Sequence, residues 1–387
     1  MSAYASRIER LRALFDEAKI DGFLISQPES RFYLSGYTGH DLPPRDSAGY
    51  LMIGKGGALL LTDPRTSEQA ENEANEYKTI VYSANARVGQ RLVESVQELG
   101  ITQLGFESIH LPYSIWESFS EALGEKGYEA ADGTKVPGPG VAMVPVKDLV
   151  DKLRITKDTA EMADLQAAID VLDDCFMHLA KHELRVGRTE KEIALAVEQY
   201  LQSRGATTSF PSIVASGPNS SMPHAVPTDR QLQEGEPITI DIGAMVNGYC
   251  SDMTRTVCIG TPSEKLREIH ALVLQAQVTA EQNIKHGMTG KDADALARDY
   301  LAEMGYGESF THGLGHGIGL EVHEPPSLSI RGSETKLEAG MVFSVEPGIY
   351  LPGWGGVRIE DLVVMEGESV RVLCRSPKAL ELEEVAR

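Results

Sequence analysis

The first third of the chain alternates short apolar runs with charged stretches. Its first residues, up to about Ala18, carry apolar side chains at helical spacing and predict an amphipathic helix. Four stretches rich in apolar residues follow, with polar segments between them: DGFLISQPESRFYLSGYTG, GYLMIG, GALLLTD and TIVYSA. Strands and helices that alternate in this way are typical of an α/β domain.

A stretch rich in proline and glycine, GTKVPGPGVAMVPV at residues 133–146, interrupts this pattern. Such clusters mark loops, so we interpret the stretch as an inter-domain connection. The length of 387 residues also favours two domains, because one domain typically takes about 100–200 residues. We therefore expect an N-terminal domain at residues 1–145 and a second domain at residues 146–387.

Helical periodicity returns at the start of the second domain. Apolar residues recur every three or four positions from Met162 to Leu179, and Asp158 with Glu161 has the spacing of an N-terminal cap. A long amphipathic helix is therefore expected there. Two more helices are predicted to begin at capping-box pairs, Thr189 with Glu192 and Thr261 with Glu264, where Pro262 would take the first helical position.

The second domain also repeats itself at an offset of 100 residues. The repeat indicates a pseudo-symmetric domain built from two related halves, each with a helix and strands. The matched pairs are Gly187 with Gly287, Thr189 with Thr289, Lys191 with Lys291, Glu192 with Asp292, Tyr200 with Tyr300, Leu201 with Leu301, Gly205 with Gly305, and Ser209-Phe210 with Ser309-Phe310.

A β-hairpin is predicted at residues 237–256, PITIDIGAMVNGYCSDMTRT, where apolar and polar residues alternate on both sides of Asn247-Gly248. If that dipeptide forms the turn, Asp241 faces Thr254 across the hairpin. Asp252 then shares a sheet face with Asp241, at a Cβ separation on the order of 5–8 Å. Two carboxylates this close repel each other unless a cation lies between them.

The other half of the repeat carries a matching pair of acids. Glu346 follows a glycine by six residues, as Asp241 does. Glu360 comes 14 residues after Glu346, against the 11 residues that separate Asp252 from Asp241. Each half therefore brings two carboxylates on paired strands, and the symmetry predicts that the two pairs face each other.

Four converging carboxylates require compensating positive charge, because an unpaired buried ion is strongly destabilising. Two divalent cations would balance them. Oxygen ligands together with one imidazole suit Mn²⁺, Co²⁺ or Zn²⁺, and we expect Mn²⁺ first.

The imidazole is expected from THGLGHGIGLEVHE at residues 311–324, which carries His312, His316 and His323 with glycines between them. Alternating glycines favour an extended backbone that approaches other groups closely. One of the three histidines can complete the metal shell while the others act on substrate. For the other histidines outside this region we favour a structural or surface role: His40, His110, His178, His182, His270 and His286.

Composition excludes several other classes of protein. The formal net charge of −21 repels nucleic acid, and no basic run opposes it. No apolar run approaches the roughly 20 residues of a membrane span, and the N-terminus lacks the apolar core of a signal peptide, so we expect a cytoplasmic protein. The four cysteines form no CxxC pair and are expected to be reduced. Neither a GxSxG nucleophile motif nor a phosphate-binding loop occurs.

Several motifs together resemble the creatinase, prolidase, aminopeptidase P and methionine aminopeptidase superfamily, the "pita-bread" metallopeptidases. They are TIDIGAMVNGYCSDMTRT, HGLGHGIGLEVHE, SVEPGIY, GVRIED and NSSMPHAVP, with fainter similarity in the N-terminal part. The resemblance implies an α/β (α+β) chain, in which a creatinase/prolidase-type N-terminal domain precedes a pseudo-two-fold catalytic domain. The N-terminal domain argues against methionine aminopeptidase, which resembles the C-terminal domain alone.

The resemblance also implies roles for individual residues. Five residues would be the ligands of a dinuclear site: Asp241, Asp252, His316, Glu346 and Glu360, with Asp252 and Glu360 bridging. His224 and His323 match the histidines that position the scissile carbonyl and stabilise the oxyanion, and His312 matches an outer histidine beside the substrate. Arg358 matches an arginine near the site of proline-specific members, and Glu346 is the candidate proton shuttle.

The activity that this resemblance implies is metal-assisted hydrolysis of the amide bond before proline in Xaa-Pro dipeptides, by a homodimeric prolidase acting on small peptides. Aminopeptidase P activity on longer peptides is the nearest alternative. A creatinase-like or ectoine-type hydrolase of small amides and a non-catalytic binding module are the others. Retention of all five ligand residues argues against metal-free, creatinase-like catalysis and against a binding module, which typically loses ligands.

Overall fold

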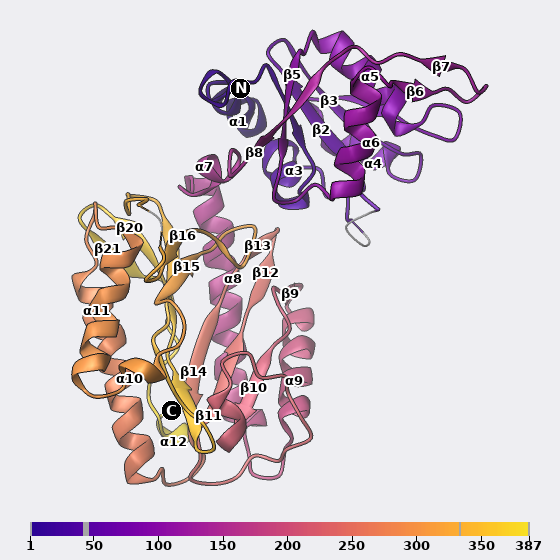
Figure 1. Cartoon of the computed structure of the whole chain (residues 1–387). Helices are drawn as coiled ribbons and strands as arrows, with labels where there is room; N and C mark the ends of the chain where they lie inside the picture. The colour runs from indigo at the N-terminus through magenta and orange to yellow at the C-terminus, as the bar shows by residue number, and fades with distance from the viewer. Residues whose placement is uncertain (1, 42–45, 333, 386–387) are drawn as a thin grey trace. The chain divides into compact units, whose positions relative to one another are not determined.

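The computed structural model describes residues 2–41, 46–332 and 334–385 (Figure 1). The chain forms two compact units, the first ending at Arg154 and the second beginning at Ile155. This division lies beyond the expected one after residue 145, because β8 (Ala142–Val146) pairs in parallel with β5 (Gln103–Glu107). The proline-rich stretch therefore supplies an edge strand of the first unit, where a proline that lacks a hydrogen-bond donor is tolerated.

The first unit is built on a six-stranded mixed sheet of order β4-β3-β2-β1-β5-β8. The expected N-terminal helix is broken in two, since α1 ends at Arg12 and Lys19 closes α2 in the left-handed region with φ of 55°. The elements of this unit are α1 (Ala3–Arg12), α2 (Phe15–Ala18), β1 (Gly22–Ile25), α3 (Pro28–Ser35), β2 (Tyr50–Gly54), β3 (Gly57–Thr62), α4 (Ser67–Glu73), β4 (Lys78–Val81), α5 (Val88–Leu99), β5, α6 (Tyr113–Leu123), β6 (Tyr128–Glu129), β7 (Lys135–Val136), β8 and α7 (Asp151–Arg154).

The second unit begins with the predicted long helix, α8 (Thr159–His178), which continues into the π-helix η1 (Leu179–Glu183). Asp158 caps it in the expected capping box with Glu161. Its apolar stripe is buried in a core that it shares with α9 (Glu190–Ser203). The predicted cap and apolar stripe are both confirmed.

The helices of the two halves obey the predicted offset of 100 residues. α9 and α11 (Gly290–Glu303) begin and end at matching positions, and Thr189 and Thr289 cap them in equivalent capping boxes. α10 (Glu264–Asn283) differs from the prediction, because Ser263 rather than Thr261 is its N-cap. The Ser263 hydroxyl accepts a hydrogen bond from the amide of Leu266, three residues on, which is the distance a cap must reach. Pro262 consequently lies before the cap, and the prediction for that helix start was wrong.

The predicted hairpin forms with the expected register. Asn247 and Gly248 take φ values of 51° and 85°, which correspond to a type I′ turn. Asp241 pairs with Thr254 as expected. The hairpin is broken at its middle, so each strand divides in two: β11 (Ile238–Ile242), β12 (Ala244–Val246), β13 (Tyr249–Cys250) and β14 (Met253–Val257).

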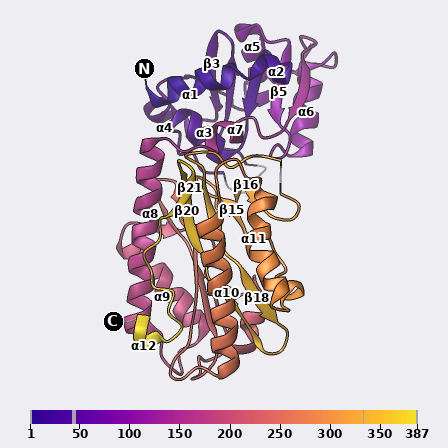
Figure 2. The same cartoon turned by 90° about the vertical axis from the view of Figure 1, so that its left-hand side faces the viewer.

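The second half repeats the broken hairpin with β17 (Val342–Val345), β18 (Gly348–Leu351), β19 (Gly355–Arg358) and β20 (Asp361–Glu366). Figure 1 shows β10, β11 and β14 running lengthwise between α9 and the pair α10 and α11, and Figure 2 shows α10 beside α11 over the strands. The other elements are β9 (Thr207–Thr208), β10 (Ile213–Ser216), η2 (Gly217–Ser221), η3 (Gly307–Ser309), β15 (Gly315–Gly317), β16 (Glu324–Leu328), β21 (Ser369–Val372) and α12 (Leu382–Val385).

Each half of the second unit has its own apolar core. One core joins α8 and α9 with β11 and β14, and the other joins α10 and α11 with β17 and β20. No helix in the described part of the chain is long and apolar enough to cross a membrane. The two cores leave a seam between the halves, and the polar residues of the predicted site lie along it.

Candidate metal centre

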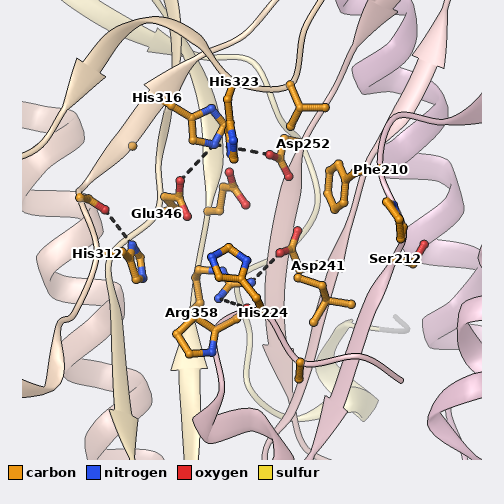
Figure 3. A pocket seen from close by; sticks show the side chains of 18 of the residues that line it. Phe210, Ser212, His224, Asp241, Asp252, His312, His316, His323, Glu346 and Arg358 are labelled. Atoms are coloured by element: carbon orange, nitrogen blue, oxygen red, sulfur yellow. Dashed lines mark hydrogen bonds and ion pairs between the residues drawn. The ribbon is translucent and has the colours of Figure 1, made fainter. Parts of the chain in front are cut away.

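A cavity of about 610 Å³ opens along this seam. Its lining includes all five predicted ligand residues and all four residues with a predicted role beside them; Figure 3 labels all of these except Glu360. These nine residues are Asp241, Asp252, His316, Glu346, Glu360, His224, His312, His323 and Arg358. The fold therefore gathers the whole predicted set from segments more than a hundred residues apart.

The broken hairpins place the acids at corresponding points. Asp252 comes directly before β14, and Glu360 comes directly before β20. In the first strand of each hairpin, Asp241 lies near the end of β11 and Glu346 follows the last residue of β17. Each break turns the backbone where a regular ladder would continue, so the acids of both hairpins reach the same space.

The glycines around His316 are required by close backbone contacts. An added Cβ on Gly315 would lie 2.0 Å from the carbonyl oxygen of Ser344, and one on Gly317 would lie 2.1 Å from that of Pro325. Glycine alone fits between these neighbouring strands. As predicted, the stretch is extended, since β15 lies between β16 and β17, and it carries the His316 ring into the cavity.

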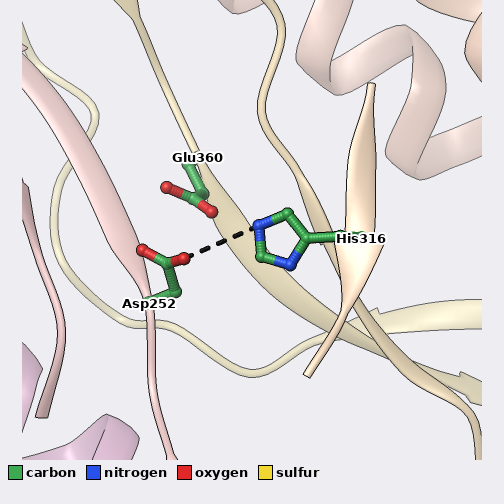
Figure 4. A group of neighbouring side chains, drawn as sticks. All are labelled: Asp252, His316 and Glu360. Atoms are coloured by element: carbon green, nitrogen blue, oxygen red, sulfur yellow. Dashed lines mark ion pairs between the residues drawn. The ribbon is translucent and has the colours of Figure 1, made fainter. Parts of the chain in front are cut away.

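Asp252, His316 and Glu360 form the tightest group of donor atoms. One ligand atom from each lies within 4.8 Å of the other two (Figure 4). Asp252 Oδ1 and Glu360 Oε1 are buried and accept no hydrogen bond from any described residue, and the same is true of Asp241 Oδ1. Buried oxygens without a donor are strongly destabilising, so these three fit a bound cation.

The pKa values of the acids reflect their burial and their closeness to one another. Burial raises the pKa of Asp252 and of Glu360 well above its usual range, and the neighbouring carboxylates raise it further. Burial also raises the pKa of Asp241, although the Arg358 guanidinium, 2.5 Å away, opposes the shift. Without a cation the site would therefore hold protons on these acids at pH values where exposed carboxyls are ionised.

Glu346 behaves differently because it lies beside His316. Their side chains approach to 3.2 Å, and although burial opposes the shift, the imidazolium lowers the pKa of Glu346 to about 2. This carboxylate in turn raises the pKa of His316 against the effect of burial. A metal ligand must be a neutral imidazole, so a cation would take the place of the proton in this pair.

Arg358 connects the two halves of the site. Its guanidinium donates to Asp241 Oδ2, to Thr254 Oγ1 at 2.9 Å and to the Tyr350 hydroxyl at 2.8 Å. Thr254 donates to Glu360 Oε2 at 2.8 Å. Sequence reasoning assigned no role to Tyr350 or Thr254, although Tyr350 lies in SVEPGIY and Thr254 faces Asp241 in the predicted register.

His312 is held on both ring nitrogens. Nδ1 lies 2.8 Å from the carbonyl oxygen of Gly313, and Nε2 lies 2.8 Å from the Tyr350 hydroxyl. Burial lowers the pKa of His312, so the neutral ring donates from Nδ1 and accepts from Tyr350, whose hydroxyl itself accepts from Arg358. His312 therefore borders the cavity without a ring nitrogen to spare for substrate.

Among the four histidines that line the cavity, His224 and His323 are the exposed residues. The His323 ring packs edge-on against His316 with 3.9 Å between centroids, and burial lowers its pKa. Neither ring forms a hydrogen bond with another described residue. These two rings are therefore available to contact a substrate.

The remaining histidines and the cysteines lie outside the cavity lining, as expected. His270 is buried on α10, and His178 packs against His182 and Tyr200. All four cysteines are free thiols, and Cys374 alone among them is only partly buried.

Two family models match the chain. Residues 163–366 match metallopeptidase family M24, and residues 7–156 match the creatinase/prolidase N-terminal domain. The chain is a member of metallopeptidase family M24. The predicted fold class is thereby confirmed, with a creatinase/prolidase-type domain followed by the pita-bread domain of that family.

Several known proteins are similar to this M24 metallopeptidase over nearly its whole length. A solved structure described as an Xaa-Pro dipeptidase from Bacillus anthracis has a TM-score of 0.88 at 41% identity, covering 98% of this chain and 99% of its own. The Xaa-Pro dipeptidase of Pyrococcus furiosus is 35% identical over 97% of this chain and 99% of the relative. The structure of an X-Pro aminopeptidase from Thermotoga maritima matches with a TM-score of 0.82 at 35% identity, covering 97% and 99%.

Membership in the M24 family implies divalent metal ions, and the donor set fits them. Carboxylate oxygens with one imidazole are a hard ligand set that suits ions such as Mn²⁺, Co²⁺ or Zn²⁺. The three buried oxygens without hydrogen bonds lie on Asp241, Asp252 and Glu360. The donor set of this M24 metallopeptidase therefore fits divalent cations.

Proposed function

We propose that the protein is a dinuclear-metal hydrolase that cleaves the amide bond before proline in Xaa-Pro dipeptides. The observation that carries this proposal is the convergence of four carboxylates and one imidazole on one cavity, with three carboxylate oxygens unsatisfied. The names of similar proteins, Xaa-Pro dipeptidases among them, support the proline specificity. The five proposed ligands are Asp241, Asp252, His316, Glu346 and Glu360, with Asp252 and Glu360 bridging.

In this proposal the chain's own residues bind, orient and transfer protons. His224 and His323 hold the scissile carbonyl and donate to the oxygen as it gains negative charge. Glu346 carries a proton to the leaving nitrogen. Arg358 donates to Asp241 Oδ2 and so orients this carboxylate. Divalent cations, when bound, polarise the carbonyl and lower the pKa of a water molecule.

The decisive experiment compares Ala-Pro with Ala-Pro-Ala as substrates, for protein loaded with Mn²⁺ and for the same protein after chelation. Metal-dependent release of alanine from the dipeptide alone is the expected result. Cleavage of neither peptide would contradict the proline-specific function, and creatine and ectoine would then be the substrates to test.

One observation favours a second candidate, an Xaa-Pro aminopeptidase that acts on longer peptides. Among the described residues that line the cavity, Arg358 is the one arginine and there is no lysine. Its guanidinium is already bonded to Asp241 and Tyr350, and burial keeps His312 and His323 at lowered pKa values. The carboxylate of a dipeptide would find no lysine in this lining and no arginine free of other bonds, whereas a longer peptide presents an uncharged amide there. Preference for Ala-Pro-Ala would establish this candidate.

We further propose that the ions are Mn²⁺, with Co²⁺ or Zn²⁺ as alternatives, and that the protein is a homodimer without nucleic-acid partners. The hard donor set supports Mn²⁺, and activity after reloading the chelated protein with each metal would rank the three. A sedimentation mass of about one chain, 42.1 kDa, would contradict the dimer. A cytoplasmic location stays a prediction that cell fractionation can test.

A further inference from the structure

The loop that carries His224 forms one wall of the cavity and has little regular structure of its own. It runs from the end of β10 at Ser216, through the short η2, to Thr228. Pro223, His224 and Val226 line the cavity from this loop, and Val226 is 79% exposed. A loop of this kind needs outside partners to hold one conformation.

One buried carboxylate supplies many of those partners, beside Gly356, which donates to Ser220, and Arg358, which donates to the carbonyl of Pro223. Glu190, the first residue of α9, is fully buried and accepts six hydrogen bonds from three loop residues. The amide and hydroxyl of Ser216 donate to Oε1 at 2.7 and 2.8 Å, and the amide and hydroxyl of Thr228 donate to Oε2 at 2.9 and 2.6 Å. Asn219 donates to both oxygens, at 3.2 and 3.1 Å. Both ends of the loop and Asn219, near its start, therefore meet at a single side chain.

Capping of α9 does not explain this carboxylate. Thr189 and Glu192 form the capping box, in which the Glu192 carboxylate accepts from the Thr189 amide at 2.7 Å. Glu190 does not line the cavity either. Its side chain is directed at the loop and satisfied by it, since hydrogen bonds to an ionised carboxylate compensate for its burial.

We propose that Glu190 is a positioning residue that holds the loop from Ser216 to Thr228 in one conformation and so fixes His224 at the cavity. The proposal rests on the proposed function, because His224 is taken there to contact the reacting carbonyl. When the loop already holds one conformation, substrate binding does not have to order His224. Such positioning matters because a displacement of about 1 Å at a reacting group can slow an enzyme by about 100-fold.

The other half of the unit holds its own histidine segment in a comparable way. The offset of 100 places Gly290 at the position of Glu190, and an added Cβ there would lie 2.0 Å from the carbonyl oxygen of Ser327. The acid stands one turn later instead. Asp294, 2% exposed, accepts from the amide of Leu314 at 2.9 Å and pairs with Arg298, whose guanidinium donates to the carbonyl of His312 at 2.6 Å. Each half thus uses a buried acid at the start of the equivalent helix to fix a segment that carries a cavity histidine.

The first test measures the loop itself, without substrate. Glu190→Gln keeps the shape of the side chain but places an amide N–H₂ against the donors of Ser216 or Thr228. We expect the amides of residues 217–227 to exchange with deuterium about tenfold faster or more, while exchange within α9 and the metal content stay unchanged. Glu192→Gln, which disturbs the start of the same helix, is the matched control and should leave the loop protected. Unchanged exchange in Glu190→Gln would overturn the proposal.

The second test asks whether Glu190 acts through His224. In the metal-loaded enzyme, Glu190→Gln should lower kcat for Ala-Pro by about 10- to 100-fold. In a His224→Ala background the same change should have little further effect, because the residue being positioned is gone. Equal losses in both backgrounds would contradict the proposal. A wild-type protein that cleaves neither peptide would contradict the proposed function instead, and the exchange measurement would still decide whether Glu190 holds the loop.

A milder variant covers the case in which Glu190→Gln fails to fold. Thr228→Val removes one hydrogen bond to Glu190, that from the Thr228 hydroxyl, at an exposed position. Exchange should then accelerate in residues 217–227 alone, by less than in Glu190→Gln. Faster amide exchange throughout the second unit would show a general loss of stability and would contradict a local effect of Glu190 on the loop.

Discussion

The two halves of the second unit share a scaffold and differ in chemistry. Both have a helix capped by threonine at positions 100 residues apart, and both have a hairpin that is broken at its middle. An acid stands directly before the returning strand in each, Asp252 in the first half and Glu360 in the second. Both acids have a buried oxygen without a hydrogen bond. The scaffold is thus repeated together with its carboxylates.

The imidazole has no such counterpart. His316 comes from β15, a strand of the second half that carries glycine on both sides of it. In the first half, β10 occupies the edge beside β11 and contributes Ile213 to the cavity instead. The difference indicates that the repeat supplies two equivalent pairs of hard ligands, while of the two strands beside the hairpins only β15 carries a nitrogen ligand.

The largest effects are expected where the halves are equivalent. Asp252→Asn and Glu360→Gln should each abolish metal-dependent activity, by about 1,000-fold or more, because each removes a proposed bridging carboxylate. Metal content by mass spectrometry should fall in both. In the chelated protein both changes should instead raise Tm, since burial holds the pKa of each acid far above normal and the amide carries no charge.

Asp164→Asn is a matched control for this pair, because Asp164 lies outside the cavity and binds the exposed Asn247 side chain. It should change neither metal content nor Tm. A large loss for Asp252→Asn with a small one for Glu360→Gln would show that the equivalence of the halves ends at the backbone.

The next largest effect is expected at Arg358, which connects the two halves through Asp241 and Tyr350. Arg358→Met removes the cation that Asp241 faces and leaves that buried carboxylate unpaired, which destabilises a protein by about 3–5 kcal/mol. Urea unfolding of the chelated protein measures this loss. Tyr350→Phe removes one hydroxyl between Arg358 and His312 and should reduce stability by only about 1 kcal/mol. Similar losses for both would argue that the guanidinium stabilises the seam through Tyr350 rather than Asp241.

Sequence reasoning succeeded where the signal was local. Asn247-Gly248 fixes both turn conformation and register, so the pairing of Asp241 with Thr254 followed from counting residues. The repeat then extended this result to the second half. The capping boxes at Asp158 and Thr189 also formed as predicted.

It failed where partners come from distant segments or where two local signals compete. The hydrogen bonds of Glu190 join a helix start to a loop more than 25 residues later, and no spacing rule predicts them. Thr261 and Ser263 both offer a cap hydroxyl, and the structure uses Ser263. The stretch at residues 133–146 contains loop-forming residues and a strand, and its pairing with β5 decided between them.

A pH effect should separate the cores of the two halves. His270 on α10 is buried, and burial lowers its pKa to about 4 from the usual 6.5. In the described parts of α8 and α9 no histidine is buried. Because the unfolded chain binds the proton more tightly, stability is complete above pH 6.5 and is lost as pH falls toward 4, by up to about 3 kcal/mol.

Urea unfolding at several pH values between 4 and 6.5 measures this loss. His270→Leu should flatten the dependence over that range, whereas His286→Gln, at an exposed position of the same half, should leave it unchanged. A slope that survives His270→Leu would assign the acid sensitivity to carboxylates rather than to this core.

The smallest effect tests how far the repeated scaffold is equivalent in energy. Thr189→Ala and Thr289→Ala each remove a cap hydroxyl from matching helices, and each should destabilise the protein by about 1 kcal/mol. The double variant should lose the sum, since the helices belong to separate cores. Thr261→Ala, at the position that the sequence wrongly predicted as a cap, is the control and should have no effect, whereas Ser263→Ala should match the other two. Unequal losses at Thr189 and Thr289 would mean that the two halves differ in stability as well as in chemistry. The proposed role of Glu190 gives a reason for such a difference, because Glu190 bonds the start of α9 to the loop from Ser216 to Thr228, whereas α11 has Gly290 at the equivalent position.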